Sequence, residues 1–299
     1  MSTNELDVSV SPQSQHITAR NINMACIIIG GSQRTGTSLV HQTLCRLPTA
    51  NPYIYEASFL TDLLECYSAA RCNFNRNYAS CFANILSLRN FCSGVVHAFL
   101  DQTTAFLGHP EHLILKEPHL TLFWPLLHEL VPEAKLLMMV RDPRDAVASM
   151  IRVGEKQKAL GQNYLFVSRD IPEICRHFLS FYEPAFSVQE DGFRRQLGIV
   201  HYEELVTDPV QTLKDIARFT GVPFDQIDLN ADPDSGRVDV DKNTTSALYS
   251  PWVTEVSGKQ PTTKQIGNYS KVLTADEIAQ VEHHCADFCR WFGYIRQAA

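Results

Sequence analysis

The sequence predicts an α/β fold: a single domain with a central parallel sheet, a P-loop-like phosphate-binding loop and helices on both faces. Short β-branched or leucine-rich runs alternate with helical patterns along the chain, which is typical of a parallel sheet covered by helices. Near the N-terminus an apolar run breaks into a glycine turn and then opens a helix, which is the order found in phosphate-binding loops.

Four segments are expected to form the sheet: residues 25–30, 113–116, 135–140 and 198–202. The middle two are continuous apolar runs, as in strands that are buried on both faces. Ligands of such sheets bind at the carboxyl ends of the strands. The residues that follow each strand are therefore the candidates for a functional site.

Helix starts are marked by capping residues and by proline. Asp142-Pro143 and Asp208-Pro209 each predict a helix, and Thr274 with Glu277 forms a capping box before a long final helix. Residues 59–64 and 74–106 are rich in Phe, Cys, Ala and Leu without a chemical motif, as in an ordinary helical core. Residues 230–270 have weak periodicity and are expected to form a long loop that either covers the site or is partly mobile.

The loop after the first strand reads Gly-Gly-Ser-Gln-Arg-Thr-Gly-Thr-Ser over residues 30–38. Gly31 and Gly36 have the spacing of the nucleoside-triphosphate loop, in which backbone N–H groups hold phosphate oxygens. Thr37 stands where that motif places lysine, so the loop is expected to bind a phosphorylated nucleotide without ordinary ATP or GTP hydrolysis. Its cation is Arg34, whose guanidinium suits a charge-delocalised oxyanion. The alternative is a turn that only packs the helix on the strand.

Two further cations follow strands. Arg141 comes directly after 135–140, and the next helix carries Ser149, so the two side chains can hold one phosphate from two sides. The alternative is that Arg141 belongs to a solvated ion-pair cluster with Asp142, Arg144 and Asp145. Lys116 ends the second strand and is a candidate for stabilising developing charge, or else a surface lysine.

Composition and charge restrict the partners. A net charge of −7 argues against non-specific nucleic-acid binding, so a small molecule is the expected partner. No repeat, low-complexity tract or proline-rich linker marks a boundary, so residues 24–299 are expected to be the domain and residues 1–23 a polar tail. The tail lacks an apolar core beside a basic flank, which predicts neither a signal peptide nor a membrane anchor. The protein is therefore expected to be cytoplasmic.

Cysteine and histidine residues give no metal motif. Nine cysteines are scattered without a C-x-x-C pair, which suits reduced thiols in an intracellular chain. The run Glu282-His283-His284-Cys285 contains metal-ligand residue types, but adjacent histidines on a helix point in different directions. No metal site is expected.

Three blocks in order resemble the sulfotransferases that use 3′-phosphoadenosine 5′-phosphosulfate (PAPS): the loop at 30–38, the block at 136–150 and the block at 201–209. The resemblance implies that residues 24–299 are a sulfotransferase domain. It also implies that the first block binds the 5′-phosphosulfate and the second the 3′-phosphate, and that the tyrosine of the third block lies near the adenine. The cofactor-binding residues so implied are Gly31, Gln33, Arg34, Thr35, Gly36, Thr37 and Ser38 in the loop, Arg141 and Ser149, and Tyr202.

Within this family the chain is most similar to the protein-tyrosine sulfotransferases and related bacterial enzymes, because the loop carries Arg34 where cytosolic phenol and steroid enzymes carry lysine. The similarity implies that Glu56 is a catalytic base and that Lys116 is a second cation beside Arg34. It also implies that the segment with Thr263 and Lys264 closes over the cofactor. The chain departs from the tyrosine enzymes in having no evident membrane anchor, secretory signal or paired cysteines.

The expected reaction is transfer of a sulfuryl group from PAPS to a hydroxyl, or an N–H group, of a small-molecule acceptor such as a secondary metabolite. In-line displacement of this kind needs positioning and electrostatics more than covalent chemistry, and no metal is required. Charge grows on the oxygen that bridges sulfur and the 5′-phosphate, so Arg34, Lys116 and the loop N–H groups are expected to act catalytically by stabilising the transition state there. PAP is the product, and Glu56 takes the acceptor proton. The alternative is that Glu56 is an exposed carboxylate that only caps a helix. His41 is an alternative base, although a packed helix histidine is the commoner case.

The same motifs are compatible with other functions. A tyrosyl-peptide sulfotransferase is one alternative, and a P-loop kinase-like phosphotransferase is another. A kinase would need an acidic Mg-binding residue at a strand end, where Lys116 and Arg141 stand instead. A non-catalytic nucleotide-binding protein on the same fold would lack a base and a second cation. No nucleic-acid or membrane partner is expected, and a homodimer is a candidate assembly.

Overall fold

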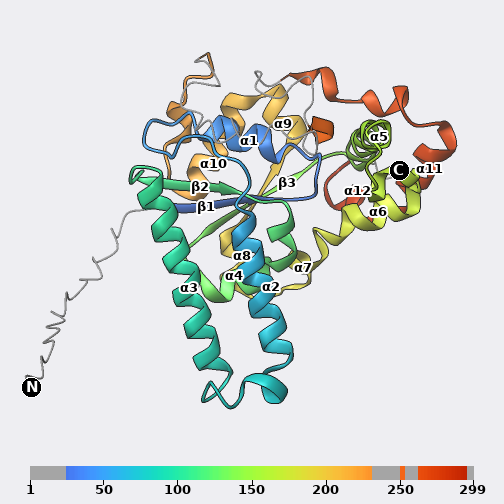
Figure 1. Ribbon diagram of the computed structural model, residues 1–299. Helices are drawn as coiled ribbons and strands as arrows, with labels where there is room; N and C mark the ends of the chain where they lie inside the picture. Colours follow the sequence, from blue (N-terminus) through green and yellow to red (C-terminus); the bar gives the residue numbers. More distant parts are fainter. Residues whose placement is uncertain (1–24, 231–249, 253–261, 295–299) are drawn as a thin grey trace, which may run out of the picture.

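The computed structural model describes residues 25–230, 250–252 and 262–294, so the predicted tail and most of the loop predicted at 230–270 lie outside the described residues. A four-stranded sheet forms the centre, in the order β2-β1-β3-β4 (Figure 1). All three strand pairings are parallel. The strands are β1 (Ala25–Gly30), β2 (His112–Lys116), β3 (Lys135–Val140) and β4 (Leu197–His201).

The predicted strands are confirmed to within one residue at each end. The one shift that concerns the site is at β4, which ends at His201, so that Tyr202 opens a helix and does not close the strand. His201 is extended and precedes the first helical turn. Tyr202 thereby keeps its place at the carboxyl end of the sheet.

Helices cover both faces of the sheet, as predicted. Because side chains alternate along a strand, Ile27 and Ile29 of β1 join one buried cluster and Cys26 and Ile28 join the other. The first cluster is completed by α1 (Thr37–Leu44), α9 (Tyr202–Thr207) and α10 (Pro209–Thr220). The second is completed by α2 (Ser58–Cys72), α3 (Ile85–Phe106), α4 (Trp124–Leu130), α5 (Pro143–Ala159) and α6 (Ile171–Ser180).

Short elements connect these layers. They are the π-turn η1 (Phe74–Tyr78), the 3-10 turns η2 (His119–Phe123), η3 (Leu165–Ser168), η4 (Phe224–Gln226), η6 (Ser250–Trp252), η7 (Thr263–Gln265) and η8 (Asn268–Lys271), and the helices α7 (Glu183–Ser187), α8 (Asp191–Gln196), α11 (Ala275–His284) and α12 (Ala286–Trp291). In Figure 1, α11 and α12 lie beside α5 and α6.

The capping signals are confirmed, with one correction. Asp142 caps α5 and Asp208 caps α10, and Thr274 with Glu277 forms both bonds of a capping box. The prediction of one long final helix is wrong, because the chain breaks at Cys285 into α11 and α12. The break turns the chain so that the Phe288 ring packs against Tyr182, with 4.7 Å between ring centroids.

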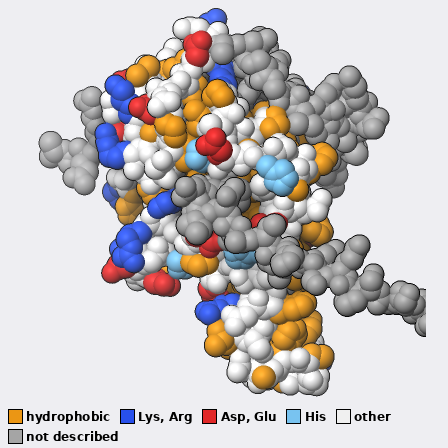
Figure 2. Space-filling model, turned by 90° about the vertical axis from the view of Figure 1, so that its left-hand side faces the viewer, with side chains coloured by type: hydrophobic (Ala, Val, Ile, Leu, Met, Phe, Trp, Pro, Cys, Tyr) orange, Lys and Arg blue, Asp and Glu red, His pale blue; other side chains and the backbone are white. Residues whose placement is uncertain are grey.

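Residues 59–64 and most of 74–106, which were expected to be helical, lie in the hairpin of α2 and α3, which projects from the body (Figure 1). Figure 2 shows hydrophobic side chains gathered on this projection, where Ile85, Leu86 and Phe91 are exposed. In the part of the chain that the structure describes, no helix is long and apolar enough to cross a membrane. All nine cysteines lie in that part and are free thiols.

Candidate functional site

The glycine loop joins β1 to α1 through three residues with left-handed backbone. Gly31 has φ 123°, Arg34 has φ 69° and Gly36 has φ 97°. A Cβ on Gly31 would lie 2.5 Å from the carbonyl oxygen of Met139, and one on Gly36 would lie 2.6 Å from the Tyr202 ring. Both glycines therefore let the loop lie directly against the carboxyl end of β3 and the start of α9.

Arg34, Arg141 and Ser149 come together at this edge. Arg34 donates from Nε to Oγ of Ser149 at 3.1 Å, and Arg141 donates from Nη1 to the carbonyl oxygen of Arg34 at 3.0 Å. Burial, together with the positive charge of Arg141, lowers the pKa of Arg34 to about 10, so Arg34 is still charged at neutral pH. Two cations held side by side form a site for a polyvalent anion.

Arg141 is fixed by an aromatic ring and by backbone carbonyls. Its guanidinium carbon lies 4.2 Å from the centroid of the Tyr202 ring, and Nη2 donates to the carbonyl oxygen of Gln265 at 2.8 Å. Among the described residues, Nε of Arg141 and Oγ of Ser32 are buried without a hydrogen-bond partner. Buried polar atoms are normally paired. A donor and a hydroxyl left over beside the loop fit a nucleotide phosphate.

Lys116 and Glu56 form an ion pair at the end of β2. Nζ of Lys116 lies 2.6 Å from Oε1 of Glu56, and the lysine side chain is 2% exposed while the glutamate is 28% exposed. The backbone joins the two segments as well, because Ala57 N donates to the carbonyl oxygen of Lys116 at 3.0 Å. The ring of Tyr55 lies 5.5 Å from Nζ. The surface-lysine alternative for Lys116 is therefore wrong.

His41 is a packed histidine. Its ring is 0% exposed, and Nε2 lies 3.2 Å from the carbonyl oxygen of Ile114. Burial, with a smaller effect from the charge of Lys116, lowers the pKa of His41 to about 3. A ring without access to the site does not suit the role of base for an incoming acceptor.

The Gln33 side chain points into the protein. Its Nε2 donates to the hydroxyl of Tyr164 at 3.3 Å and lies 3.3 Å from Nε2 of His119, while its Oε1 lies 3.1 Å from Nε2 of His177. The amide is thus used to hold the loop. Any contact of Gln33 with a nucleotide would come from its backbone.

The other predicted residues of the loop and the late segment have different positions. Thr35 donates its hydroxyl to the carbonyl oxygen of Ser32 at 2.6 Å, so it stabilises the loop. Thr37 and Ser38 lie in the first turn of α1, where backbone N–H groups face phosphate in such loops. Thr263 and Lys264 lie on η7 and are exposed, next to the Gln265 carbonyl that binds Arg141.

Three contributors to the site carried no sequence signal. Oγ1 of Thr121 accepts from Gly31 N at 2.7 Å, and the hydroxyl of Tyr182 donates to the carbonyl oxygen of Met139 at 3.1 Å. The carbonyl oxygen of Trp252 accepts from Nη1 of Arg34 at 3.0 Å. These residues are distant in sequence, and their roles depend on backbone paths that the pattern does not specify.

Among residues 25–230, 250–252 and 262–294, no group of three or more His, Cys, Asp and Glu side chains is arranged to hold a metal ion. Cys285 is buried, and contact with Cys175 together with burial raises its pKa. A thiol in that state packs as a small hydrophobic group.

Comparison with solved structures gives the same fold. The sulfotransferase domain from the curacin biosynthetic pathway superposes with a TM-score of 0.51 at 14% identity, covering 89% of this chain and 97% of that domain. The sulfotransferase STF9 from Mycobacterium avium superposes with a TM-score of 0.52 at 12% identity, covering 90% of this chain and 77% of that one.

Curated relatives match in sequence over part of their length. A putative protein-tyrosine sulfotransferase of Caenorhabditis elegans is 31% identical over 134 residues, which is 44% of this chain and 48% of the relative. The protein-tyrosine sulfotransferase of Drosophila melanogaster is 26% identical over 226 residues, 74% of this chain and 43% of the relative. Mouse carbohydrate sulfotransferase 5 is 27% identical over 124 residues, 37% of this chain and 31% of the relative.

The chain thus spans less than half the length of these curated relatives. A family model described as the sulfotransferase family matches residues 26–226, a stretch that contains the loop, the Lys116–Glu56 pair and the Arg141–Ser149 site. The chain belongs to the sulfotransferase family.

Proposed function

We propose that this protein transfers a sulfuryl group from PAPS to a hydroxyl group of a small-molecule acceptor and releases PAP. The observation that carries the proposal is the anion site, in which Arg34 donates to Ser149 at 3.1 Å beside the Arg141 guanidinium. A nucleotide with phosphates at two positions needs a second anion site besides the glycine loop. Arg141, Ser149 and Arg34 supply it.

Glu56 and Lys116 are the proposed catalytic pair. When bound, PAPS supplies the sulfuryl group and a leaving phosphate oxygen. Glu56 takes the proton of the acceptor hydroxyl while the acceptor oxygen bonds to sulfur and the bond from sulfur to the 5′-phosphate oxygen breaks. Only one carboxylate oxygen of Glu56 binds Lys116, and a carboxylate has a second oxygen for the proton. Lys116 stabilises charge that grows on the leaving oxygen.

From sequence, Arg34 is expected to stabilise charge on the oxygen that bridges sulfur and the 5′-phosphate, together with Lys116. Its contacts with Ser149 and Trp252 favour a binding role beside Arg141 over a catalytic one. The other contacts with the nucleotide are proposed as follows. Backbone N–H groups of the loop bind the 5′-phosphate, Tyr202 lies near the adenine, and Thr263 and Lys264 contact the cofactor from the segment beside Gln265.

Cofactor choice gives the first prediction. PAP should raise the melting temperature without Mg²⁺, because a ligand that binds only the native state stabilises it by mass action. At 100 times its dissociation constant the stabilisation is about 2.7 kcal/mol, which corresponds to about 5–10 °C for a domain of this size. ATP with Mg²⁺ should shift the midpoint much less. Stabilisation by ATP with Mg²⁺ and none by PAP would reject the proposed cofactor.

The acceptor class is a separate part of the proposal. Similarity to proteins named protein-tyrosine sulfotransferases supports a tyrosyl peptide as the second candidate acceptor. A panel of phenols, alcohols, amines and tyrosine-containing peptides, incubated with PAPS and analysed for an added sulfuryl mass, separates the two. We expect a small hydroxyl compound to be modified; modification of peptides alone would replace that acceptor.

A cytoplasmic location and a homodimer also belong to the proposal, and light scattering tests the latter.

A further inference from the structure

The block that follows β3 reads Arg-Asp-Pro-Arg-Asp over residues 141–145, and the proposed nucleotide site uses only its first residue. Asp145 lies in the first turn of α5 and is 3% exposed. A carboxylate buried this deeply needs hydrogen-bond donors. Its donors come from a segment more than 120 residues later in the chain.

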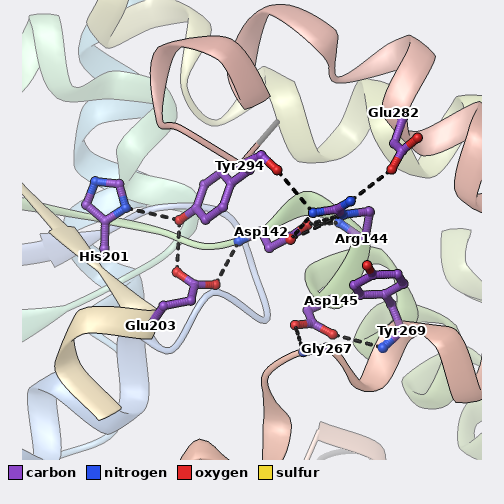
Figure 3. A network of polar contacts seen from close by, with 9 residues as sticks. All are labelled: Asp142, Arg144, Asp145, His201, Glu203, Gly267, Tyr269, Glu282 and Tyr294. Atoms are coloured by element: carbon purple, nitrogen blue, oxygen red, sulfur yellow. Dashed lines mark hydrogen bonds and ion pairs between the residues drawn. The ribbon is translucent and has the colours of Figure 1, made fainter. Parts of the chain in front are cut away.

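Asp145 holds the turn between η7 and η8. Its Oδ2 accepts from Gly267 N at 2.7 Å, and its Oδ1 accepts from Tyr269 N at 2.9 Å (Figure 3). Gly267 has φ 71°, so the turn needs a residue that tolerates left-handed backbone. Both carboxylate oxygens are therefore used to fix one turn of the backbone.

The same turn contacts the nucleotide site. Gln265, two residues before Gly267, accepts from Nη2 of Arg141 through its carbonyl oxygen at 2.8 Å. Lys264, proposed to contact the cofactor, is the preceding residue. At the C-terminal end of this turn, the Arg144 guanidinium lies 4.9 Å from the centroid of the Tyr269 ring. Figure 3 shows Asp145 and Arg144 facing this segment from α5.

We propose that Asp145 is a positioning residue for nucleotide binding, which acts by anchoring the Gln265–Tyr269 turn and, through it, the Arg141 guanidinium and Lys264. The proposal rests on the proposed function, since the ligand concerned is the 3′-phosphorylated nucleotide. Both oxygens of Asp145 are used by the backbone of this turn, so no phosphate contact is assigned to Asp145. Its effect passes through the backbone that it holds.

A role of Asp145 through its charge and a role through positioning predict opposite effects of Asp145→Asn on PAP affinity. Asp145 is electrostatically coupled to Arg141, so its negative charge opposes the binding of an anion there. If only charge mattered, Asp145→Asn would tighten the binding of PAP. If Asp145 positions the turn, the same change weakens binding, because the asparagine NH₂ group faces a backbone N–H donor where an acceptor is needed.

The experiment measures PAP affinity by calorimetry for the full chain and for three variants. Asp145→Asn should weaken PAP binding about 10-fold, in line with the loss of a hydrogen bond to a charged group. Gly267→Ala changes the turn without touching the carboxylate: its Cβ meets no atom within 4 Å, but φ 71° is strained for alanine. Gly267→Ala should therefore also weaken PAP binding.

Glu282→Gln is the matched control. Glu282 accepts from Nη1 of Arg144 at 2.8 Å on the far side of the network, so the change removes one negative charge and leaves the turn intact. PAP affinity should stay within about 2-fold of wild type, as expected for a surface ion pair.

Hydrogen exchange measured without nucleotide supplies a readout that does not depend on the cofactor. Peptides covering residues 264–271 should exchange faster in Asp145→Asn than in wild type or Glu282→Gln, because one of the two backbone N–H groups loses its acceptor oxygen. Unchanged exchange there, or PAP binding by Asp145→Asn as tight as wild type or tighter, would overturn the positioning role. Failure of wild type to bind PAP would instead reject the proposed function, and the exchange result would still decide whether Asp145 holds the turn.

Discussion

Glu56→Gln is expected to lower turnover with an alcohol acceptor by about 10²–10⁴, the usual contribution of a general base. Glutamine keeps the size of the side chain and cannot take the proton. Affinity for PAP should change little, because Glu56 is proposed to act on the acceptor. Steady-state turnover and PAP calorimetry on the same preparation check both statements.

The loss should depend on the acceptor. A phenol that is partly ionised needs a base less than an aliphatic alcohol does, so Glu56→Gln should make the rate depend more steeply on acceptor acidity. The change also leaves the buried Lys116 ammonium without its carboxylate, which destabilises the fold. Melting temperature must therefore be compared. Glu65→Gln, the same substitution at an exposed site on α2, is the control. Turnover of Glu56→Gln close to wild type with every acceptor would remove Glu56 from the mechanism.

Much of the fold could be predicted from the sequence because its signals are local. Continuous apolar runs predict the strands, and Asp142, Asp208 and Thr274 predict helix starts through side-chain bonds to nearby N–H groups. The strand order β2-β1-β3-β4 depends on crossovers that no local pattern encodes. The break at Cys285 was likewise invisible, because residues 275–291 keep helical composition on both sides of it.

The site likewise contains residues whose positions have local sequence signals and residues whose positions do not. Lys116 and Arg141 could be placed at strand ends from sequence, since strand ends are local features, and both lie there. The direction of the Arg34 side chain could not be predicted, because it depends on the left-handed backbone of Arg34, which has φ 69°. The alternative that places Asp145 in a solvated ion-pair cluster is wrong, because its side chain is buried. Its partners Gly267 and Tyr269 are backbone groups, which leave no residue-type signal.

Arg141→Ala is expected to weaken PAP binding by about 10²-fold or more, since it removes a charge-assisted contact in a partly desolvated site. Turnover at saturating PAPS should fall much less, because a phosphate contact distant from sulfur is made equally in the ground and transition states. Calorimetry with PAP and with AMP, which lacks the 3′-phosphate, locates the contact. Arg218→Ala, at an exposed ion pair on α10, is the control.

The comparison of the two nucleotides forms a double-mutant cycle between side chain and phosphate. If Arg141 binds the 3′-phosphate, Arg141→Ala should remove most of the preference for PAP over AMP while AMP affinity stays nearly unchanged. Arg34→Ala should do the same if its contact with Ser149 places it at that phosphate. A fall in turnover with the preference retained would instead assign Arg34 to the sulfuryl group. Equal losses of PAP and AMP affinity in Arg141→Ala would contradict the 3′-phosphate assignment, because Arg141 would then contact a part that both nucleotides share.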